Sequence, residues 1–151
     1  MAERTLKRDE LRSYVGQRLG ASSWHEVTQE QVGLFADATG DHQWIHVDPE
    51  RAKDGPFGGA IAHGFLTLSL IPVLLAATVK IRQRMGVNYG LNRVRFTSPV
   101  PVGAKIRARF GVKDVSEADG SGAQVVWDIG IECEGSERPA CVAEFITRHY
   151  F

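Results

Sequence analysis

The chain has 151 residues, of which 43% are hydrophobic and 24% charged, and these proportions favour a single globular domain over residues 1–151. Its 18 basic and 18 acidic residues leave no net charge that would attract nucleic acid or an anionic membrane surface. The most apolar segment, residues 65–79, is shorter than the roughly 20 residues that cross a bilayer, so we expect no membrane insertion. The charged first ten residues lack the apolar core of a signal peptide, which favours a cytoplasmic location.

The first predicted element is a helix that begins after Thr28 and ends at Gly40. Thr28 and Gln31 have the spacing of a capping box, and apolar residues follow at helical intervals. Glycine commonly ends a helix in the left-handed conformation, which predicts a stop at Gly40. Asp41 is therefore the first residue of a loop that can turn its side chain inward.

Two further helices are predicted before the sheet. Residues 48–52, Asp-Pro-Glu-Arg-Ala, indicate a short helix, because Asp is a favoured cap and Pro a favoured first residue. Residues 54–59, Asp-Gly-Pro-Phe-Gly-Gly, then form a flexible turn. The segment from 63 to about 80 is apolar on nearly every face, which predicts one long buried helix, bent at Pro72 and wrapped by other structure.

The C-terminal half contains four segments with the alternating pattern of half-buried strands, residues 87–96, 104–115, 124–134 and 139–150. Their links are short and rich in turn formers, so we expect an antiparallel meander that curls around the helix. The sequence thus predicts an α+β fold with a long buried central helix wrapped by a curved antiparallel β-sheet. Cys133 and Cys141 lie in strand-like segments, and we expect two buried, unbridged thiols.

Asp41 and His46 are candidates for an acid/base pair. On one continuous helix, side chains five residues apart point about 140° away from each other, but the stop at Gly40 lets a loop bring them together. A carboxylate and an imidazole that share one water could take a proton from it and supply a proton elsewhere, as addition of water to a double bond requires. The backbone N–H of Gly64, in the first turn of the long helix, could polarise a substrate carbonyl.

These residues resemble the motifs of the MaoC-like (R)-specific enoyl-CoA hydratases, a family with the hotdog fold. The matching segments are Gly40-Asp41 through Ile45-His46, Ala62-His63-Gly64, and Val94-Arg95-Phe96 with Pro99-Val100. The resemblance implies reversible hydration of trans-2-enoyl-CoA to (R)-3-hydroxyacyl-CoA, with Asp41 and His46 as the catalytic pair and Gly64 as the donor to the thioester carbonyl. It also implies a coenzyme A or carrier-protein thioester as substrate, no further cofactor, and a homodimer joined edge to edge.

One segment differs from the family, which has Asn-Pro where this chain has Gln43-Trp44. Gln43 keeps an amide on a longer stem, whereas Trp44 replaces a rigid proline with a large ring. Gln43, Trp44, Phe57 and His63 are candidate substrate-binding residues, although His63 is more simply interpreted as packing beside the site. The acyl-chain length stays open, as does the choice of basic residues between positions 80 and 109 that hold coenzyme A phosphates.

Three alternatives stand beside this hypothesis. One is a hotdog acyl-CoA thioesterase, which would attack the same thioester carbonyl with water. Another is a non-catalytic acyl-thioester binding subunit. The third is a metal site at His42 and His46, but that spacing suits a metal only on a continuous helix, and we therefore predict no metal ligands.

Overall fold

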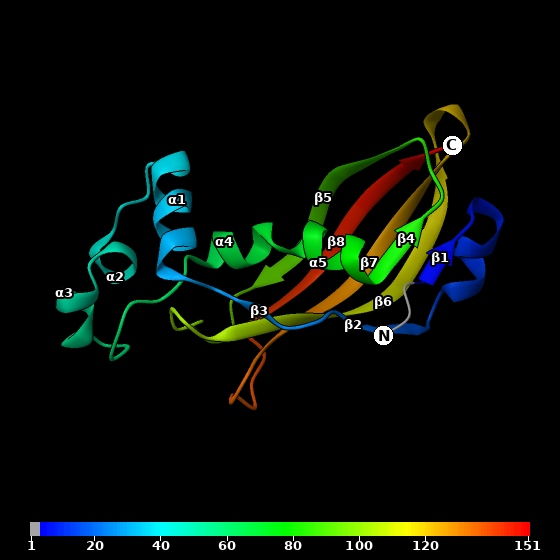
Figure 1. Ribbon diagram of the computed structural model, residues 1–151. Coiled ribbons are helices and arrows are strands. Elements are labelled where there is room, and N and C mark those ends of the chain that lie inside the picture. The colour runs from blue at the N-terminus through cyan, green and yellow to red at the C-terminus, as the bar shows by residue number, and fades with distance from the viewer. Residues whose placement is uncertain (1–3) are drawn as a thin grey trace.

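The structure is a computed structural model that describes residues 4–151 (Figure 1). Its strands are β1 (Arg4–Leu6), β2 (Arg18–Ala21), β3 (His25–Glu26), β4 (Val79–Ile81), β5 (Met85–Arg95), β6 (Lys105–Ala118), β7 (Gly122–Cys133) and β8 (Cys141–Tyr150). Its helices are α1 (Gln29–Thr39), α2 (Trp44–Val47), α3 (Pro49–Lys53), α4 (Gly64–Ser69) and α5 (Ile71–Thr78), with the 3-10 helices η1 (Arg8–Tyr14) and η2 (Asp119–Ser121). No helix within residues 4–151 is long and apolar enough to cross a membrane.

The main sheet is antiparallel, with strand order β2-β6-β7-β8-β5 and β3 paired to β6. Strands β6, β7 and β8 form the predicted meander. The prediction was wrong for β5, which pairs with β8 at the far edge of the sheet and not with β6, the next strand in the chain. The link after β5 contains two prolines and runs beside residues 60–62, where the Ala62 N–H donates to the Val100 carbonyl at 2.8 Å. A link held in this way cannot fold back as a tight hairpin.

The predicted long helix is divided into α4 and α5, which break at Leu70, and the helical conformation ends at Thr78. Pro72 has no N–H to donate to the carbonyl four residues earlier, which explains the break. Beyond α5, residues 79–81 form β4, which pairs in parallel with β1. Val79 and Ile81 are β-branched residues that favour a strand. The predicted helix was too long at its C-terminal end, because apolar character alone does not separate a buried helix from a short buried strand.

One face of α4 and α5 packs on the sheet. Buried residues of this face, including Leu66, Ile71 and Leu74, belong to the same core as Trp127 and Phe110. The opposite face is uncovered in the single chain, where Phe65 and Val73 are 66% and 58% exposed. The sheet therefore covers one side of the helices as predicted, and the other side is left open in the single chain.

Two smaller predictions are confirmed. Asp48 caps α3, its Oδ1 accepting a hydrogen bond from the Arg51 N–H at 3.1 Å. Cys133 and Cys141 are buried and unbridged, and burial raises the pKa of the Cys141 thiol to about 11. The chain therefore places neither thiol where it would act as a nucleophile at neutral pH.

Candidate functional site

Helix α1 delivers Asp41 to the site. The Thr28 hydroxyl oxygen accepts from the Gln31 N–H at 3.1 Å, which confirms the predicted cap. The second half of the capping box is replaced by a different contact, in which His25 Nε2 donates to the Gln31 side-chain oxygen at 2.9 Å. Gly40 ends the helix with φ +83°, in the left-handed region that glycine adopts without strain. Asp41 is thus released from the helix as predicted.

The short helix α2, which the sequence did not predict, carries His46. Trp44 begins this helix, and the guanidinium of Arg51 lies 4.4 Å from its ring. The same ring packs against Gly55, where a Cβ would come within 2.9 Å of it. Trp44 therefore ties α2 to the turn after α3, and the large ring does not prevent His46 from approaching Asp41.

Hydrogen bonds fix the orientation of His46, whose side chain is buried. Its Nδ1 donates to the Ile61 carbonyl at 2.7 Å, and its own carbonyl accepts from the Gln29 side-chain amide at 2.8 Å. With the proton on Nδ1, a neutral ring has a free lone pair on Nε2. His46 is therefore held in the form that can accept a proton at Nε2.

His63 lies directly against His46, with ring centroids 3.9 Å apart and planes inclined by 24°. Its Nε2 donates to the Asp41 carbonyl at 2.9 Å, so His63 holds the backbone of the residue that carries the carboxylate. Its Nδ1 is buried and has no hydrogen-bond partner among the described residues. Because an unpaired buried nitrogen is costly, such an atom marks a position that a water or ligand atom can complete.

Asp41, His46 and His63 together form a cluster in which one donor atom from each lies within 4.8 Å of the others. Asp41 is exposed and the two histidines are buried, so the carboxylate lies on the solvent side. Two imidazoles and a carboxylate could also hold a transition-metal ion. The ligand pair considered from the sequence is not formed, since His42 turns outward to Asp37 at 2.9 Å, a hydrogen bond that raises the pKa of His42.

A cavity of about 320 Å³ lies at the start of α4, and it is linked to the cluster through Ile61, whose carbonyl accepts from His46. Its lining includes Phe57, Ile61, Ala62, Gly64, Thr67 and Phe96. Gly64 is the first residue of α4, and the amides of a first helical turn have no partner within the helix. A Cβ at Gly64 would come within 2.8 Å of the Phe96 ring, so a side chain here would displace that ring. Glycine at this position therefore leaves space between the first turn of α4 and the Phe96 ring.

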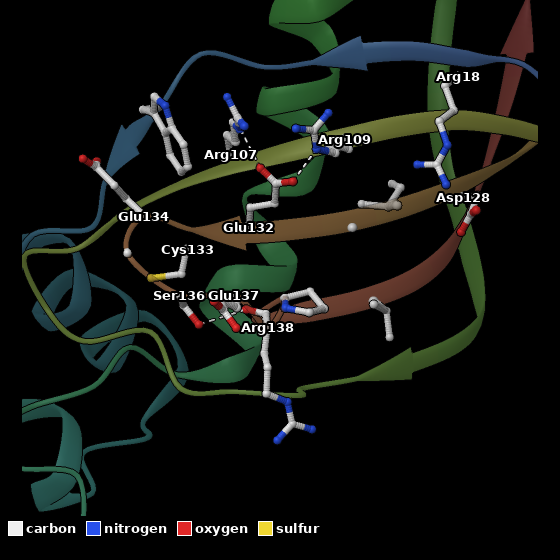
Figure 2. A pocket seen from close by; sticks show the side chains of 16 residues that line it. Arg18, Arg107, Arg109, Asp128, Glu132, Cys133, Glu134, Ser136, Glu137 and Arg138 are labelled. Carbon is white, nitrogen blue, oxygen red and sulfur yellow. Dashed lines mark hydrogen bonds and ion pairs between the residues drawn. The ribbon is translucent and has the colours of Figure 1, made fainter.

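A groove of about 600 Å³ on the face of the sheet away from the helices is more polar (Figure 2). Arg107 and Arg109 both pair with Glu132, and these contacts, above all that with Arg109, hold the pKa of the Glu132 carboxyl below its usual range. The groove has four arginines and four acidic residues in its lining, so their charges cancel. It shares no lining residue with the cavity at Gly64. We take the cluster and the cavity at Gly64 as the candidate site, because the predicted catalytic pair and Gly64 lie there.

A helix pair packed on a curved antiparallel sheet, with a carboxylate and an imidazole beside the start of that pair, is the arrangement expected of a hotdog-fold hydratase or dehydratase. The family described as MaoC like domain matches residues 10–130, and the chain belongs to this family. The predicted family, the hotdog fold and the hydro-lyase class are thereby confirmed.

Known relatives agree with this assignment. The chain is 50% identical over 141 residues to 3-hydroxyacyl-thioester dehydratase Z of Mycobacterium tuberculosis, and 93% of each chain is covered. It is also 50% identical over 138 residues to nodulation protein N of Rhizobium leguminosarum bv. viciae, with 89% of this chain and 86% of the relative covered. The solved (R)-hydratase of A. caviae involved in PHA biosynthesis superposes with a TM-score of 0.68 at 26% identity, covering 88% and 94% of the two chains.

The predicted site residues fall in three places: Asp41, His46 and His63 in the cluster, Phe57 and Gly64 at the cavity, and Gln43 and Trp44 at the start of α2. The sequence did not predict the hydrogen bonds of Gln29 and Ile61 to His46, or the contact of Phe96 with Gly64. Ile61 acts through its carbonyl, which every residue has, so no side-chain pattern could reveal it. Phe96 belongs to a recognised motif, but its contact depends on the path of β5.

Proposed function

We propose that this protein is an (R)-specific enoyl-CoA hydratase, which adds water reversibly to trans-2-enoyl-CoA and yields (R)-3-hydroxyacyl-CoA. The observation that carries the proposal is the convergence of the Asp41 carboxylate with two buried histidines whose ring orientations are fixed. The names of the relatives at 50% and 26% identity, a 3-hydroxyacyl-thioester dehydratase and an (R)-hydratase, support the same chemistry.

In the proposed reaction Asp41 and His46 hold the reacting water. The water oxygen bonds to C3 of the enoyl group, its proton passes to one member of the pair, and the other member delivers a proton to C2. Nε2 of His46 can serve in either role because its Nδ1 stays bonded to the Ile61 carbonyl. The assignment of base and acid between the two residues stays open.

Gly64 is proposed to stabilise the charge that develops on the thioester oxygen. Gly64 lines the cavity at the start of α4, and its N–H would be the donor there, with the positive end of the helix adding to the effect. Phe57 lines the same cavity and is proposed to contact the acyl group. His63 is proposed to accept a hydrogen bond at Nδ1 from the water or the 3-hydroxyl, and Gln43 and Trp44 to line the entrance.

An assay with crotonyl-CoA separates this function from its alternatives. A hydratase removes the ultraviolet absorption of the conjugated enoyl thioester without releasing free thiol, whereas a thioesterase releases coenzyme A. The product of hydration should be the (R) isomer by chiral chromatography. Release of thiol would favour the thioesterase, and neither change would favour a binding subunit.

We propose that the reaction uses no metal or redox cofactor. The test is whether overnight dialysis against a chelator changes the hydration rate, because the Asp41 cluster has the donor atoms for an ion. An unchanged rate agrees with acid/base catalysis by the side chains alone. A loss that a divalent cation restores would assign the cluster to a metal.

We also propose a homodimer joined through the edge strand β5. This strand has a free edge and leaves Val87, Tyr89 and Leu91 exposed, and it lies beside α5, whose Val73 is exposed as well. Apolar surface next to a free strand edge favours pairing with a second chain. By sedimentation analysis Val87→Lys should shift the protein toward monomer, whereas Val15→Lys, at a valine of matching exposure, should leave a dimer. A monomeric wild type would refute the dimer.

A further inference from the structure

Four side chains form a continuous hydrogen-bonded chain at the far end of the helix from Gly64. Trp127 Nε1 donates to Thr147 Oγ1 at 2.8 Å, Thr147 Oγ1 and His149 Nε2 are 2.6 Å apart, and His149 Nδ1 contacts the side-chain oxygen of Gln83. Trp127, Thr147 and His149 are buried, while Gln83 is exposed. The chain thus leads from the core to a surface amide.

The chemistry of these groups fixes the direction of each hydrogen bond. An indole N–H can only donate, so Thr147 accepts from Trp127. Burial lowers the pKa of His149 to about 4, and the neutral ring has a single N–H at pH 7. Because Nδ1 faces the Gln83 oxygen, that N–H is on Nδ1, and Nε2 accepts from the Thr147 hydroxyl. The oxygen of Gln83 is therefore occupied, and its NH2 group remains as the free donor.

The NH2 group of Gln83 lies at a small cavity. A Cβ at Gly86 would come within 2.7 Å of Gln83 Nε2, so the glycine gives the amide its room. The cavity has a volume of about 160 Å³. Its walls include the apolar residues Pro72, Leu75, Val79 and Phe145 and two amides, Gln83 and Asn88, with no Lys, Arg, Asp or Glu among the lining residues that the structure describes. This environment suits an alkyl chain with one neutral polar group.

The cavity lies along the same helix pair and the same edge of the sheet as the cavity at Gly64. Thr67 and Ala140 line the Gly64 cavity, while Leu75 and Phe145 line the distal one, so both lie between the helices and the β8 side of the sheet. From Gly64 to Ala76 the helical rise is about 18 Å at 1.5 Å per residue. An extended acyl chain that begins at Gly64 and follows the helices would reach Gln83 with its far end.

We propose that the distal cavity binds the far end of an acyl chain that carries a neutral oxygen, a hydroxyl or a ketone, and that the Gln83 amide donates to this oxygen. The assignment of the occupant as an acyl chain rests on the proposed function. A carboxylate is disfavoured because no cation lines the cavity. A plain alkyl end would desolvate the NH2 group without replacing its hydrogen bond, which a site built around a donor discriminates against.

Calorimetric binding of saturated acyl-CoAs tests this inference without any need for turnover. Pairs of equal chain length, with and without a hydroxyl at the far end, are compared over lengths that include a span of about 18 Å. Wild type should bind the hydroxylated member about tenfold more tightly at the fitting length, equivalent to one hydrogen bond of about 1.4 kcal/mol. Equal affinities at every length would overturn the proposal.

Two variants of similar size sharpen the test. Gln83→Glu keeps an oxygen for His149 Nδ1–H but loses the NH2 donor, so the preference should vanish. Gln17→Glu changes a glutamine whose amide donates to the Ser13 carbonyl, and should keep the preference. A preference that survives Gln83→Glu contradicts the proposal. Crotonyl-CoA turnover, measured in parallel, tests the proposed function separately, because a binding preference without turnover would refute only the hydratase.

Discussion

Two buried histidines at opposite ends of the same helix pair differ in how their nitrogens are used. His149, 5% exposed, has partners at both nitrogens, in a chain that begins at Trp127. His63, 2% exposed, has a partner at Nε2 and, within residues 4–151, none at Nδ1. Satisfied buried polar groups stabilise a fold, whereas an unpaired one costs stability and is retained where it serves another purpose. The comparison predicts that the hydrogen bonds of His149 stabilise the fold and that, under the proposed function, His63 takes part in the reaction.

The strongest test of this contrast is Asp41→Asn at the His63 end. The change keeps the volume of the side chain and removes its charge, so kcat/KM for crotonyl-CoA should fall by about 100-fold to 10,000-fold while the folded structure persists. The measurement is the initial rate of loss of the enoyl absorption, together with circular dichroism of the variant.

Asp37→Asn is the matched control, because Asp37 is an exposed carboxylate on α1 that pairs with His42 and not with the cluster. Its activity should stay within about twofold of wild type, as is usual for surface changes. If Asp41→Asn and Asp37→Asn were equally active, the carboxylate in the cluster would have no part in catalysis.

The next test concerns His149 and the pH dependence of stability. Its pKa is about 4 in the folded protein against 6.5 ordinarily, so between these values the unfolded chain binds a proton that the folded chain does not. The free energy of unfolding should therefore fall as the pH drops from 6.5 to 4, by roughly 3 kcal/mol in total. His149→Gln cannot titrate, and urea unfolding should show that it lacks this loss.

The sign of this effect distinguishes His149 from an exposed histidine. The hydrogen bond to Asp37 raises the pKa of His42, so that group contributes stability at low pH and loses it as the pH rises. His42→Gln should therefore change the pH dependence of the free energy of unfolding slightly, and with the opposite sign. A wild type and a His149→Gln variant with parallel pH profiles would contradict the buried, neutral ring.

Local patterns predicted the parts of the molecule that depend on neighbours in sequence. Strands β6, β7 and β8 alternate clearly and follow one another through short turns, and Gly40 ends α1 where a glycine should. The parts that were missed depend on distant contacts. At the far edge, β5 is followed by a link that bonds to residues 60–62, as in the Ala62–Val100 hydrogen bond, and β4 pairs with β1, which lies far from it in the sequence.

The same distinction applies to the site. Asp41, His46 and Gly64 have side-chain or backbone chemistry that a motif reveals, whereas the Ile61 carbonyl that orients His46 belongs to a residue with no polar side chain. The unpaired nitrogen of His63 is a property of the packed structure and has no counterpart in the sequence. The sequence therefore predicted the candidate reactive groups, and the structure adds what holds them in place.

Thr147→Val tests whether the hydrogen bonds that link Trp127, Thr147 and His149 stabilise the fold. The valine leaves the buried Trp127 N–H without an acceptor, so the free energy of unfolding should fall by about 1–3 kcal/mol. Thr147→Ser keeps the hydroxyl and should lose less. Both values come from urea unfolding at pH 7. A Thr147→Val variant as stable as wild type would mean that the chain contributes nothing to stability.

Among the four predicted changes, Gly64→Ala should have the smallest effect, because the close contact that it creates can relax. The new Cβ would come within 2.8 Å of the Phe96 ring, but Phe96 is 45% exposed and can turn away. We expect kcat/KM to fall about tenfold, or about 1.4 kcal/mol in activation free energy, with little change in stability. The double variant Gly64→Ala/Phe96→Ala, measured against Phe96→Ala alone, then separates two causes. If the loss of kcat/KM disappears in the Phe96→Ala background, the displaced ring was responsible. If it persists, the methyl group itself keeps the thioester from the Gly64 N–H, as the proposed role of Gly64 requires.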